Sequence, residues 1–246
     1  MTGDGRPNLD DSRALLSRAR KHFAELKEQT SPRNLWQTAE SQDSATGEWS
    51  CHLHLNRAGL VAAKPIIADC ANNLISALDH VVAAIARANG CGRHRNLYFP
   101  LGVTDDDFAK SLGSATSRLG EQMANVLTET RAAHRNEIPH IASAKEIANS
   151  GKHWELIVAE ASALAVAWHV PGSGQQIVQV PPDAFLSEDT FEFYQGAERL
   201  PRAPLNIVIQ LAIGGLDDTL PKFPDLILEG AVRFVEAVIG AVSEAS

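Results

Sequence analysis

The sequence predicts an α+β protein, with an antiparallel sheet of about five or six strands packed against a helical layer that contains one long amphipathic helix. Residues 10–29, 60–88 and the C-terminal segment carry apolar residues at helical spacing. Residues 34–56 and 163–213 instead alternate with a period of two. With 246 residues, 44% of them hydrophobic, the chain can bury a sizeable core. We expect one domain over 1–246, with residues 1–9 disordered.

The first half of the chain predicts helix, hairpin and helix. A helix over 10–29 ends at Ser31-Pro32. The runs LWQTA and EWSCHLHL, separated by the turn-forming SQDSATG, predict two antiparallel strands. A long helix is expected over 60–88, and Pro65 is tolerable only in its first turn.

The second half predicts further helices and four strands. Thr104 caps a helix over 105–112, a second helix spans 114–134, and Ser143 begins a capping box that ends at Glu146. Four alternating segments follow, and they predict a meander: ALAVAWHV, QQIVQV, TFEFY and LNIVIQLAI. The C-terminal helix has one apolar face and is expected to lie across the sheet.

Composition excludes several classes of protein. A formal net charge of −8 argues against tight, non-specific binding of nucleic acid, because Lys and Arg supply that affinity. No stretch of about 20 apolar residues is present, so no membrane span is expected. The polar N-terminus is unlike a secretory signal, and three widely spaced cysteines indicate free thiols in a reducing, cytoplasmic compartment. We expect no cofactor and no metal.

One face of the long helix is polar. Five residues, which we call the polar stripe, fall within about 40° of one another at 100° per residue: Asp69, Asn73, Ser76, His80 and Arg87. Exposed faces usually carry Lys and Glu, whereas short Asn, Ser and Asp side chains suit fixed hydrogen bonds in a crevice or an interface. The stripe is therefore either a solvated face or part of a ligand or protein interface.

Three short motifs resemble a family of uncharacterised bacterial and phage proteins. The chain has NLISALDH on the long helix, then FPL, then GKHW, where the family has N-L-R-S-A-L-D-H, F-P-I and D-K-H-R. Ile75, Gly151 and Trp154 depart from the pattern, so charges that the family carries are absent here.

The resemblance implies a shared fold more than a shared activity. Five residues match the family motifs: Asn73, Asp79, His80, Lys152 and His153. The Asp-His and Lys-His pairs are able to converge as acid, base and phosphate-binding groups. A buried polar network that holds two helices in register is the alternative for the same residues.

Two further patterns suggest chemistry. The stretch from Arg135 to His140, RNEIPH, has the spacing of the HEPN ribonuclease motif, in which Arg stabilises phosphate charge and His acts as general acid or base. Pro139 would break a helix, which favours a surface loop instead. His52 and His54 lie on one side of a predicted strand and make at most half a metal site.

The sequence therefore favours a ligand-binding or protein-interaction module. Its binding residues are four of the polar stripe, Asp69, Asn73, Ser76 and His80, together with Asp79, Lys152 and His153. Self-association into a homo-oligomer is part of this hypothesis. The alternative is a hydrolase, a HEPN-like ribonuclease with Arg135 and His140 as catalytic residues, and only that alternative involves nucleic acid. No complete catalytic set is visible, which favours the binding module.

Overall fold

A computed structural model describes residues 6–92, 97–153, 159–170, 174–181, 184–185, 189–200 and 206–246. The side chains of residues 151–153, 159–165, 168–170, 174–175 and 206–210 are not described. The chain forms two compact units. One, the helical unit, comprises Met1–Glu25, Pro65–Ile157 and Gly215–Ser246, and the other, the sheet unit, comprises Leu26–Lys64 and Val158–Gly214. The predicted α+β class is confirmed.

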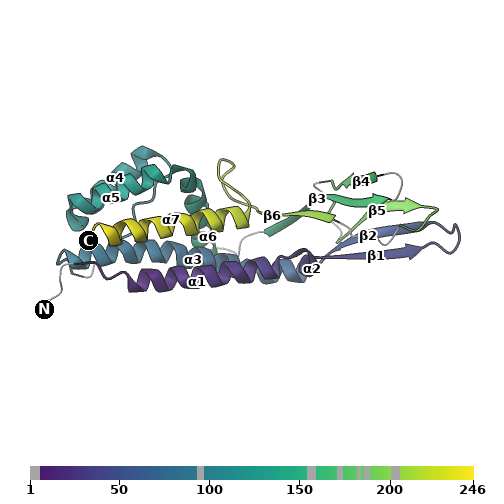
Figure 1. The fold of residues 1–246 in the computed structure, drawn as a ribbon, viewed down its shortest axis with the longest axis horizontal. Helices are drawn as coiled ribbons and strands as arrows, with labels where there is room; N and C mark the ends of the chain where they lie inside the picture. The colour runs from purple at the N-terminus through teal and green to yellow at the C-terminus, as the bar shows by residue number, and fades with distance from the viewer. Residues whose placement is uncertain are drawn as a thin grey trace. The chain divides into compact units, whose positions relative to one another are not determined.

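The helical unit is built from amphipathic helices (Figure 1). They are α1 (Asp10–Gln29), α3 (Arg57–Ala88), α4 (Asp105–Leu119), α5 (Glu121–Ala133), the short 3-10 helix η1 (Arg135–Glu137), α6 (Ile138–His153) and α7 (Pro224–Glu244). The division between the units falls within α1 and within α3. Helix α7 packs on α5, α6 and η1 in this unit, so its apolar face covers helices, whereas the sequence analysis placed it across the sheet.

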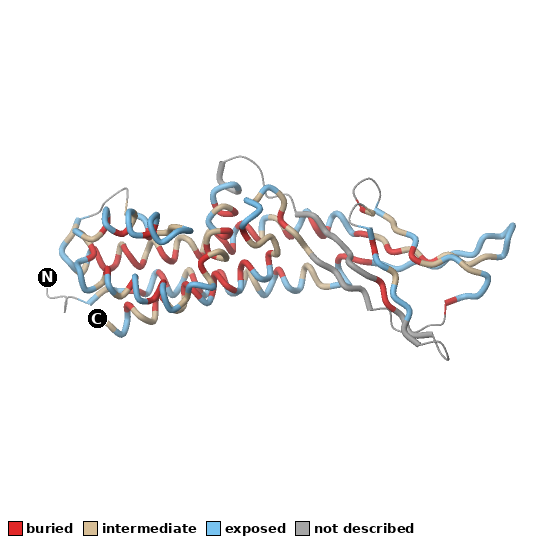
Figure 2. Tube along the Cα trace, turned by 90° about the horizontal axis from the view of Figure 1, so that it is seen from above, coloured by how far each residue is buried: buried red, intermediate tan, exposed pale blue. Residues whose placement is uncertain are grey.

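The core of the helical unit lies where the apolar periodicity predicts it. Five residues opposite the polar stripe of α3 are at most 1% exposed: Ile67, Leu74, Leu78, Val81 and Ile85. The predicted apolar face of α7 is also at most 1% exposed: Ile227, Ala231, Val235, Val238 and Val242. Figure 2 colours the buried residues along the chain red. Cys70 of α3 donates its thiol to the carbonyl of Ala19 in α1 at 3.3 Å, which shows how closely these two helices pack.

The sheet unit contains two three-stranded antiparallel sheets. One has the order β1-β2-β5, and its strands are β1 (Trp36–Gln42), β2 (Trp49–Leu55) and β5 (Thr190–Gly196). The other has the order β4-β3-β6, and its strands are β3 (Ala159–Val170), β4 (Gly174–Gln179) and β6 (Asn206–Ile213). The short helix α2 (Pro32–Leu35) precedes β1.

The prediction of one sheet of five or six strands is therefore wrong, although six strands are present among the described residues. β5 pairs with β2 and β6 pairs with β3, so the predicted meander does not form. A period of two reveals which face of a strand is buried, but it carries no information about which strand lies beside it.

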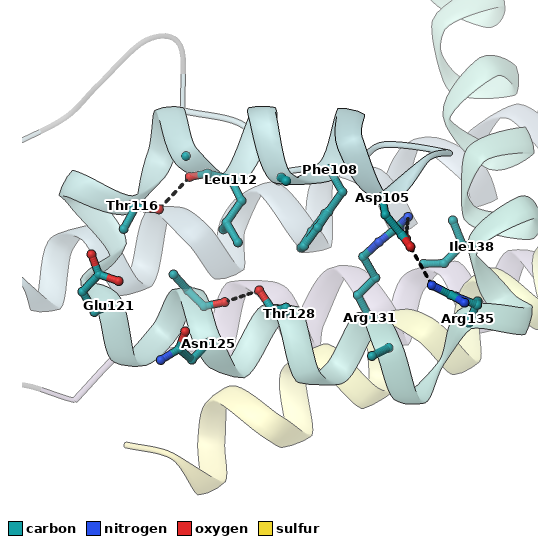
Figure 3. Close-up of a pocket in the computed structure, with 14 residues that line it drawn as sticks. Asp105, Phe108, Leu112, Thr116, Glu121, Asn125, Thr128, Arg131, Arg135 and Ile138 are labelled. Atoms are coloured by element: carbon teal, nitrogen blue, oxygen red, sulfur yellow. Dashed lines mark hydrogen bonds and ion pairs between the residues drawn. The ribbon is translucent and has the colours of Figure 1, made fainter.

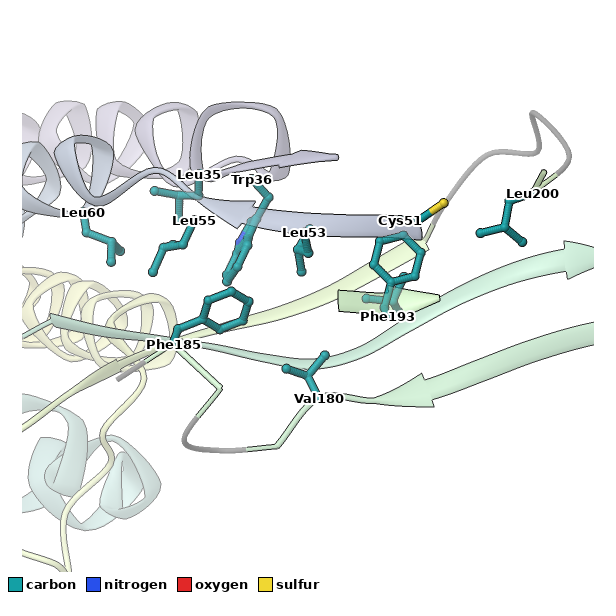
Figure 4. Close-up of a cluster of buried hydrophobic side chains, with 11 residues drawn as sticks. Leu35, Trp36, Cys51, Leu53, Leu55, Leu60, Val180, Phe185, Phe193 and Leu200 are labelled. Atoms are coloured by element: carbon teal, nitrogen blue, oxygen red, sulfur yellow. The ribbon is translucent and has the colours of Figure 1, made fainter. Parts of the chain in front are cut away.

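Residues from both sheets share one apolar cluster (Figure 4). In β2, alternate residues Cys51, Leu53 and Leu55 are buried, as expected for a strand with one face in a core. The other buried members are Leu35, Trp36, Leu60, Val166, Val180, Phe185, Phe193 and Leu200. The Trp36 and Phe185 rings meet edge to face, with centroids 4.8 Å apart.

Several element boundaries differ from the predicted ones. α3 begins at Arg57 and continues through Pro65, which leaves the carbonyl of Val61 without its helical donor. Both residues are exposed, so water is available to that carbonyl. The break between α4 and α5 is at Gly120, which has a φ of 77°, and not at residue 113. The predicted Thr104 cap is confirmed, since its hydroxyl accepts from the Asp107 amide.

The start of α6 was also wrongly predicted. The helix begins at Ile138, and Pro139 occupies its first turn, where a missing N–H costs nothing. Ser143 therefore lies inside the helix and does not cap it, and its hydroxyl bonds to the carbonyls of Pro139 and Pro221 at 3.1 Å. At the N-terminus, residues 1–5 lie outside the described residues, whereas Leu9 is described and 3% exposed. The expected disorder of residues 1–5 thus falls outside the described residues, whereas residues 6–9 are described.

Candidate functional site

The polar stripe lies along the edge of the packing between α1 and α3. Asp69 and Arg87 are exposed, while the three residues between them are half-buried. The Asn73 amide donates to the Asp69 carbonyl of its own helix at 2.7 Å. The His80 Nδ1 lies 3.5 Å from an Asp11 carboxylate oxygen of α1. The contacts described for these residues are thus within α3 or with α1, and the stripe lines neither of the cavities described below.

The predicted convergence around Asp79 and His80 stays a prediction. Asp79 Oδ1 accepts a hydrogen bond from the Phe99 amide at 2.8 Å, whereas His80 faces α1. Successive helical residues differ by about 100° in direction, so neighbours in sequence do not share a face. Lys152 and His153 belong to the last turn of α6, but their side chains lie outside the described residues, as does Trp154.

Arg135 and His140 bond to different partners. Arg135 Nη2 donates to Asp105 Oδ2 of α4 at 2.6 Å. The His140 Nδ1 lies 3.1 Å from the Asn136 carbonyl, and its ring packs against Gly230 of α7. Neither lies in the surface loop that Pro139 suggested, because Arg135 begins η1 and His140 is in the first turn of α6.

The side chains of His52 and His54 each contact a side chain of the neighbouring strand β5. His52 Nε2 lies 3.4 Å from Glu192 Oε2, and His54 Nδ1 lies 2.9 Å from the Thr190 hydroxyl. The described part of the chain holds no group of three or more His, Cys, Asp or Glu side chains placed to bind a metal ion. In the same part of the chain, no helix combines the length and apolar character needed to cross a bilayer.

A groove of about 490 Å³ lies along the hairpin of α4 and α5 (Figure 3). Its floor is formed by the buried side chains of Phe108, Leu112 and Ala124. Small or polar residues form its rim, and we call the whole the α4–α5 groove. The remaining lining residues are Asp105, Ala109, Gly113, Thr116, Glu121, Asn125, Thr128, Arg131, Ala132, Arg135 and Ile138.

Neither threonine of the groove offers a free hydroxyl hydrogen. Thr116 donates its hydroxyl to the Leu112 carbonyl at 2.9 Å, and Thr128 donates to the Ala124 carbonyl at 2.9 Å. Both bonds run back to the preceding helical turn (Figure 3). These threonines therefore present their methyl groups and oxygen lone pairs, and this part of the groove suits an apolar chain.

One end of the groove is ionic. The Asp105 carboxylate binds two arginines, with Oδ1 at 3.2 Å from Arg131 Nη2 and Oδ2 at 2.6 Å from Arg135 Nη2. Figure 3 shows these three side chains together at the end opposite Glu121. A second cavity of about 340 Å³ adjoins the same three residues and is also lined by Val103, Thr104, Ile138 and Pro139.

Arg131 is anchored from several sides. Its guanidinium donates to the Gly102 carbonyl at 3.0 Å and to the Val103 carbonyl at 3.3 Å, besides Asp105. Its Cζ lies 4.7 Å from the centre of the Phe108 ring, within range of a cation–π interaction. The residue is only 7% exposed, whereas the Arg135 side chain is 73% exposed. Arg131 therefore closes the end of the groove and fixes Asp105, and Arg135 remains accessible.

The sequence analysis named only Arg135 among the residues of this groove. Thr104 predicted the start of α4, but nothing in the sequence pairs α4 with α5. A usable signal was present, since Arg131 and Arg135 are four residues apart on one helical face, beside the small residues Thr128 and Ala132.

Comparison with protein-family models, with curated proteins and with solved structures finds no match to this chain. The resemblance carried by NLISALDH, FPL and GKHW thus stays a prediction.

Proposed function

We propose that the protein is a non-enzymatic binding module whose α4–α5 groove takes a small, elongated and mainly apolar molecule. The observation that carries the proposal is the groove itself, about 490 Å³ with a buried apolar floor and charged groups confined to its ends. Ligand pockets typically measure about 300–1,000 Å³ and combine apolar walls with a few placed polar groups.

The lining residues favour binding over catalysis. No His, Cys or Lys is among the residues that line the groove. The carboxylate of Asp105 is engaged by two arginines, and both threonine hydroxyls donate to their own helix. A nucleophile beside a base, the minimum for most covalent or acid–base catalysis, is thus absent from the groove lining.

An uncharged fluorescent probe, N-phenyl-1-naphthylamine, tests this proposal. The parent protein is expected to bind the probe and raise its fluorescence. Thr128→Phe fills the groove and is expected to abolish the increase, whereas Glu129→Phe, at the next residue of α5, does not line the groove and is expected to retain it. An increase that survives Thr128→Phe would rule the α4–α5 groove out as the binding site.

A cytoplasmic location and self-association belong to the same proposal. The described cysteines Cys51, Cys70 and Cys91 are all free thiols, which suits a reducing compartment. Self-association is measured by light scattering of the purified protein, and a monomer at all concentrations would contradict it.

A further inference from the structure

We infer that the groove recognises a linear monocarboxylate, whose acid group binds Arg135 and whose hydrocarbon chain lies along α4 and α5. The inference rests on the proposed function and names the class of ligand. A medium-length fatty acid has this chemistry.

Among the residues that line the groove at its ionic end, the charge favours an anion. Arg131 and Arg135 carry two positive charges, and Asp105 supplies one negative charge. The three groups together have an excess of one positive charge. Both oxygens of Asp105 already accept an arginine, so this end has more unused donors than acceptors.

Arg135 is the group that is able to bind the ligand. The Arg131 guanidinium is buried and already donates to Asp105 and to two backbone carbonyls. Arg135 makes one described hydrogen bond, through Nη2 to Asp105, although a guanidinium has five N–H donors. Its planar fork matches a carboxylate, and its side chain is 73% exposed at the mouth of both cavities.

The other end selects against a second acid. Glu121 lines the groove near the N-terminus of α5, on the side away from Arg135 (Figure 3). From Glu121 to Ala133, α5 rises over twelve residues, which is about 18 Å at 1.5 Å per residue, and Arg135 lies beyond that end. An extended chain of about ten to twelve carbons reaches roughly 12–14 Å, so its methyl end stays among the threonine methyl groups. A diacid of that length would instead direct a second negative charge toward Glu121.

Displacement of N-phenyl-1-naphthylamine by decanoate and by 1-decanol tests the inference. Both ligands fill the groove with the same chain, but only decanoate carries a negative charge. Decanoate is expected to bind the parent about tenfold more tightly than decanol, the typical effect of one charge-assisted contact at a partly exposed site. Decanedioate is expected to bind no better than decanol.

Arg135→Gln is expected to remove the preference for decanoate and to leave decanol affinity unchanged. Arg87→Gln, at an exposed arginine of α3 that does not line the groove, makes the same change in net charge and is expected to keep the preference. If decanoate and decanol bind the parent equally, or if Arg87→Gln removes the preference as fully as Arg135→Gln, the inference is overturned while the proposed function stands. Failure of both ligands and of the probe to bind would overturn the proposed function as well.

Discussion

At the scale of single residues, the two arginines of the groove have different surroundings, and the same substitution is expected to affect them differently. Arg131→Met removes two hydrogen bonds to backbone carbonyls, the cation–π contact with Phe108 and the ion pair with Asp105. The expected loss of stability is about 2–4 kcal/mol, because two hydrogen bonds from a buried charged group, a cation–π contact and an ion pair are lost together. The measurement is urea unfolding followed by circular dichroism.

Arg135→Met is the matched control for this stability effect. Its single ion pair with Asp105 is exposed, and such pairs contribute less than about 1 kcal/mol. If both substitutions have the same small cost, Arg131 does not anchor the end of the groove.

Cys70 makes stability depend on alkaline pH. Burial raises the pKa of this thiol from about 9 to about 12. Below pH 9 the thiol is protonated in the folded and unfolded states, so it adds no pH dependence. Above pH 9 the unfolded thiol loses its proton while the folded one keeps it, so stability falls as pH rises toward 12.

By pH 10 this one group is expected to lower the free energy of unfolding by about 1.4 kcal/mol relative to pH 7. Cys70→Ala is expected to be less stable at pH 7 but to lose correspondingly less between pH 7 and pH 10. Urea unfolding of both proteins at the two pH values makes the comparison, and identical losses would show that the thiol does not titrate differently in the two states.

At this scale the sequence identified polar residues of the long helix but not their contacts. Asp79 Oδ1 accepts the amide hydrogen of Phe99, a contact that the sequence did not predict, and the convergence of Asp79 with His80 stays a prediction. Which side chain meets a backbone amide twenty residues away depends on the path of the connecting segment, and local periodicity does not encode that path.

At the scale of elements, the packing of α6 on α7 requires a glycine. A Cβ at Gly230 would lie 2.5 Å from His140 Cγ and 2.8 Å from His140 Cβ, too close to be relieved by a rotamer change. Gly230→Ala is therefore expected to destabilise the protein by about 1–2 kcal/mol, since overpacking exceeds the gain in helix propensity. Thermal or urea unfolding measures the change.

Two further variants make this test specific. Gly240 lies in the same helix with no atom within 4 Å of its added Cβ, so Gly240→Ala is expected to stabilise by up to about 1 kcal/mol. In a His140→Gly background, which removes both the ring and the Cβ that lies 2.8 Å away, Gly230→Ala is expected to be neutral or stabilising. A cost that persists there would mean that the His140 side chain is not what excludes a side chain at position 230.

Elements with strong local signals were predicted well. The bounds of α1, the β1–β2 hairpin and the end of α3 agree with the sequence, because periodicity, turn residues and Asn89-Gly90 all act locally. Errors arose where tertiary packing outweighed a local preference. Pro65 remains inside α3, and Ser143 lies within α6 because its hydroxyl bonds to Pro139 and Pro221 instead of capping a helix.

At the scale of the whole molecule, strand pairing is what the sequence could not supply. β2 pairs with β5 across more than one hundred residues, and β6 pairs with β3 instead of β5. In β2 the alternation agrees with the buried face, since Cys51, Leu53 and Leu55 are buried. Side chains from both three-stranded sheets contribute to one apolar cluster. One larger sheet would bury the same alternating residues, so composition and alternation did not distinguish one sheet from two.

The charge of the whole molecule bears on the ribonuclease alternative. A net charge of −8 opposes the approach of a polyanion, and the arginine of the RNEIPH motif is partly neutralised by Asp105. We therefore expect a labelled single-stranded RNA to bind more weakly than about 10⁻⁴ M at physiological salt, measured by fluorescence anisotropy. We also expect no cleavage of that RNA, since the His140 ring packs against Gly230 and its Nδ1 lies at the Asn136 carbonyl.

His140→Ala decides between the structural and the catalytic role of this histidine. If its role is structural, the substitution changes stability, and neither parent nor variant cleaves RNA. His134→Ala, at a half-buried histidine six residues away, is the matched control. A different pattern would establish the ribonuclease: the parent cleaves RNA, His140→Ala does not, and His134→Ala still does, while all three proteins bind the probe equally. The groove would then be a secondary site. The chain is acidic and is expected to bind RNA poorly, so any cleavage would be weak. Even weak cleavage with that pattern would be decisive, because the activity of a contaminating nuclease would not change with a substitution in this protein.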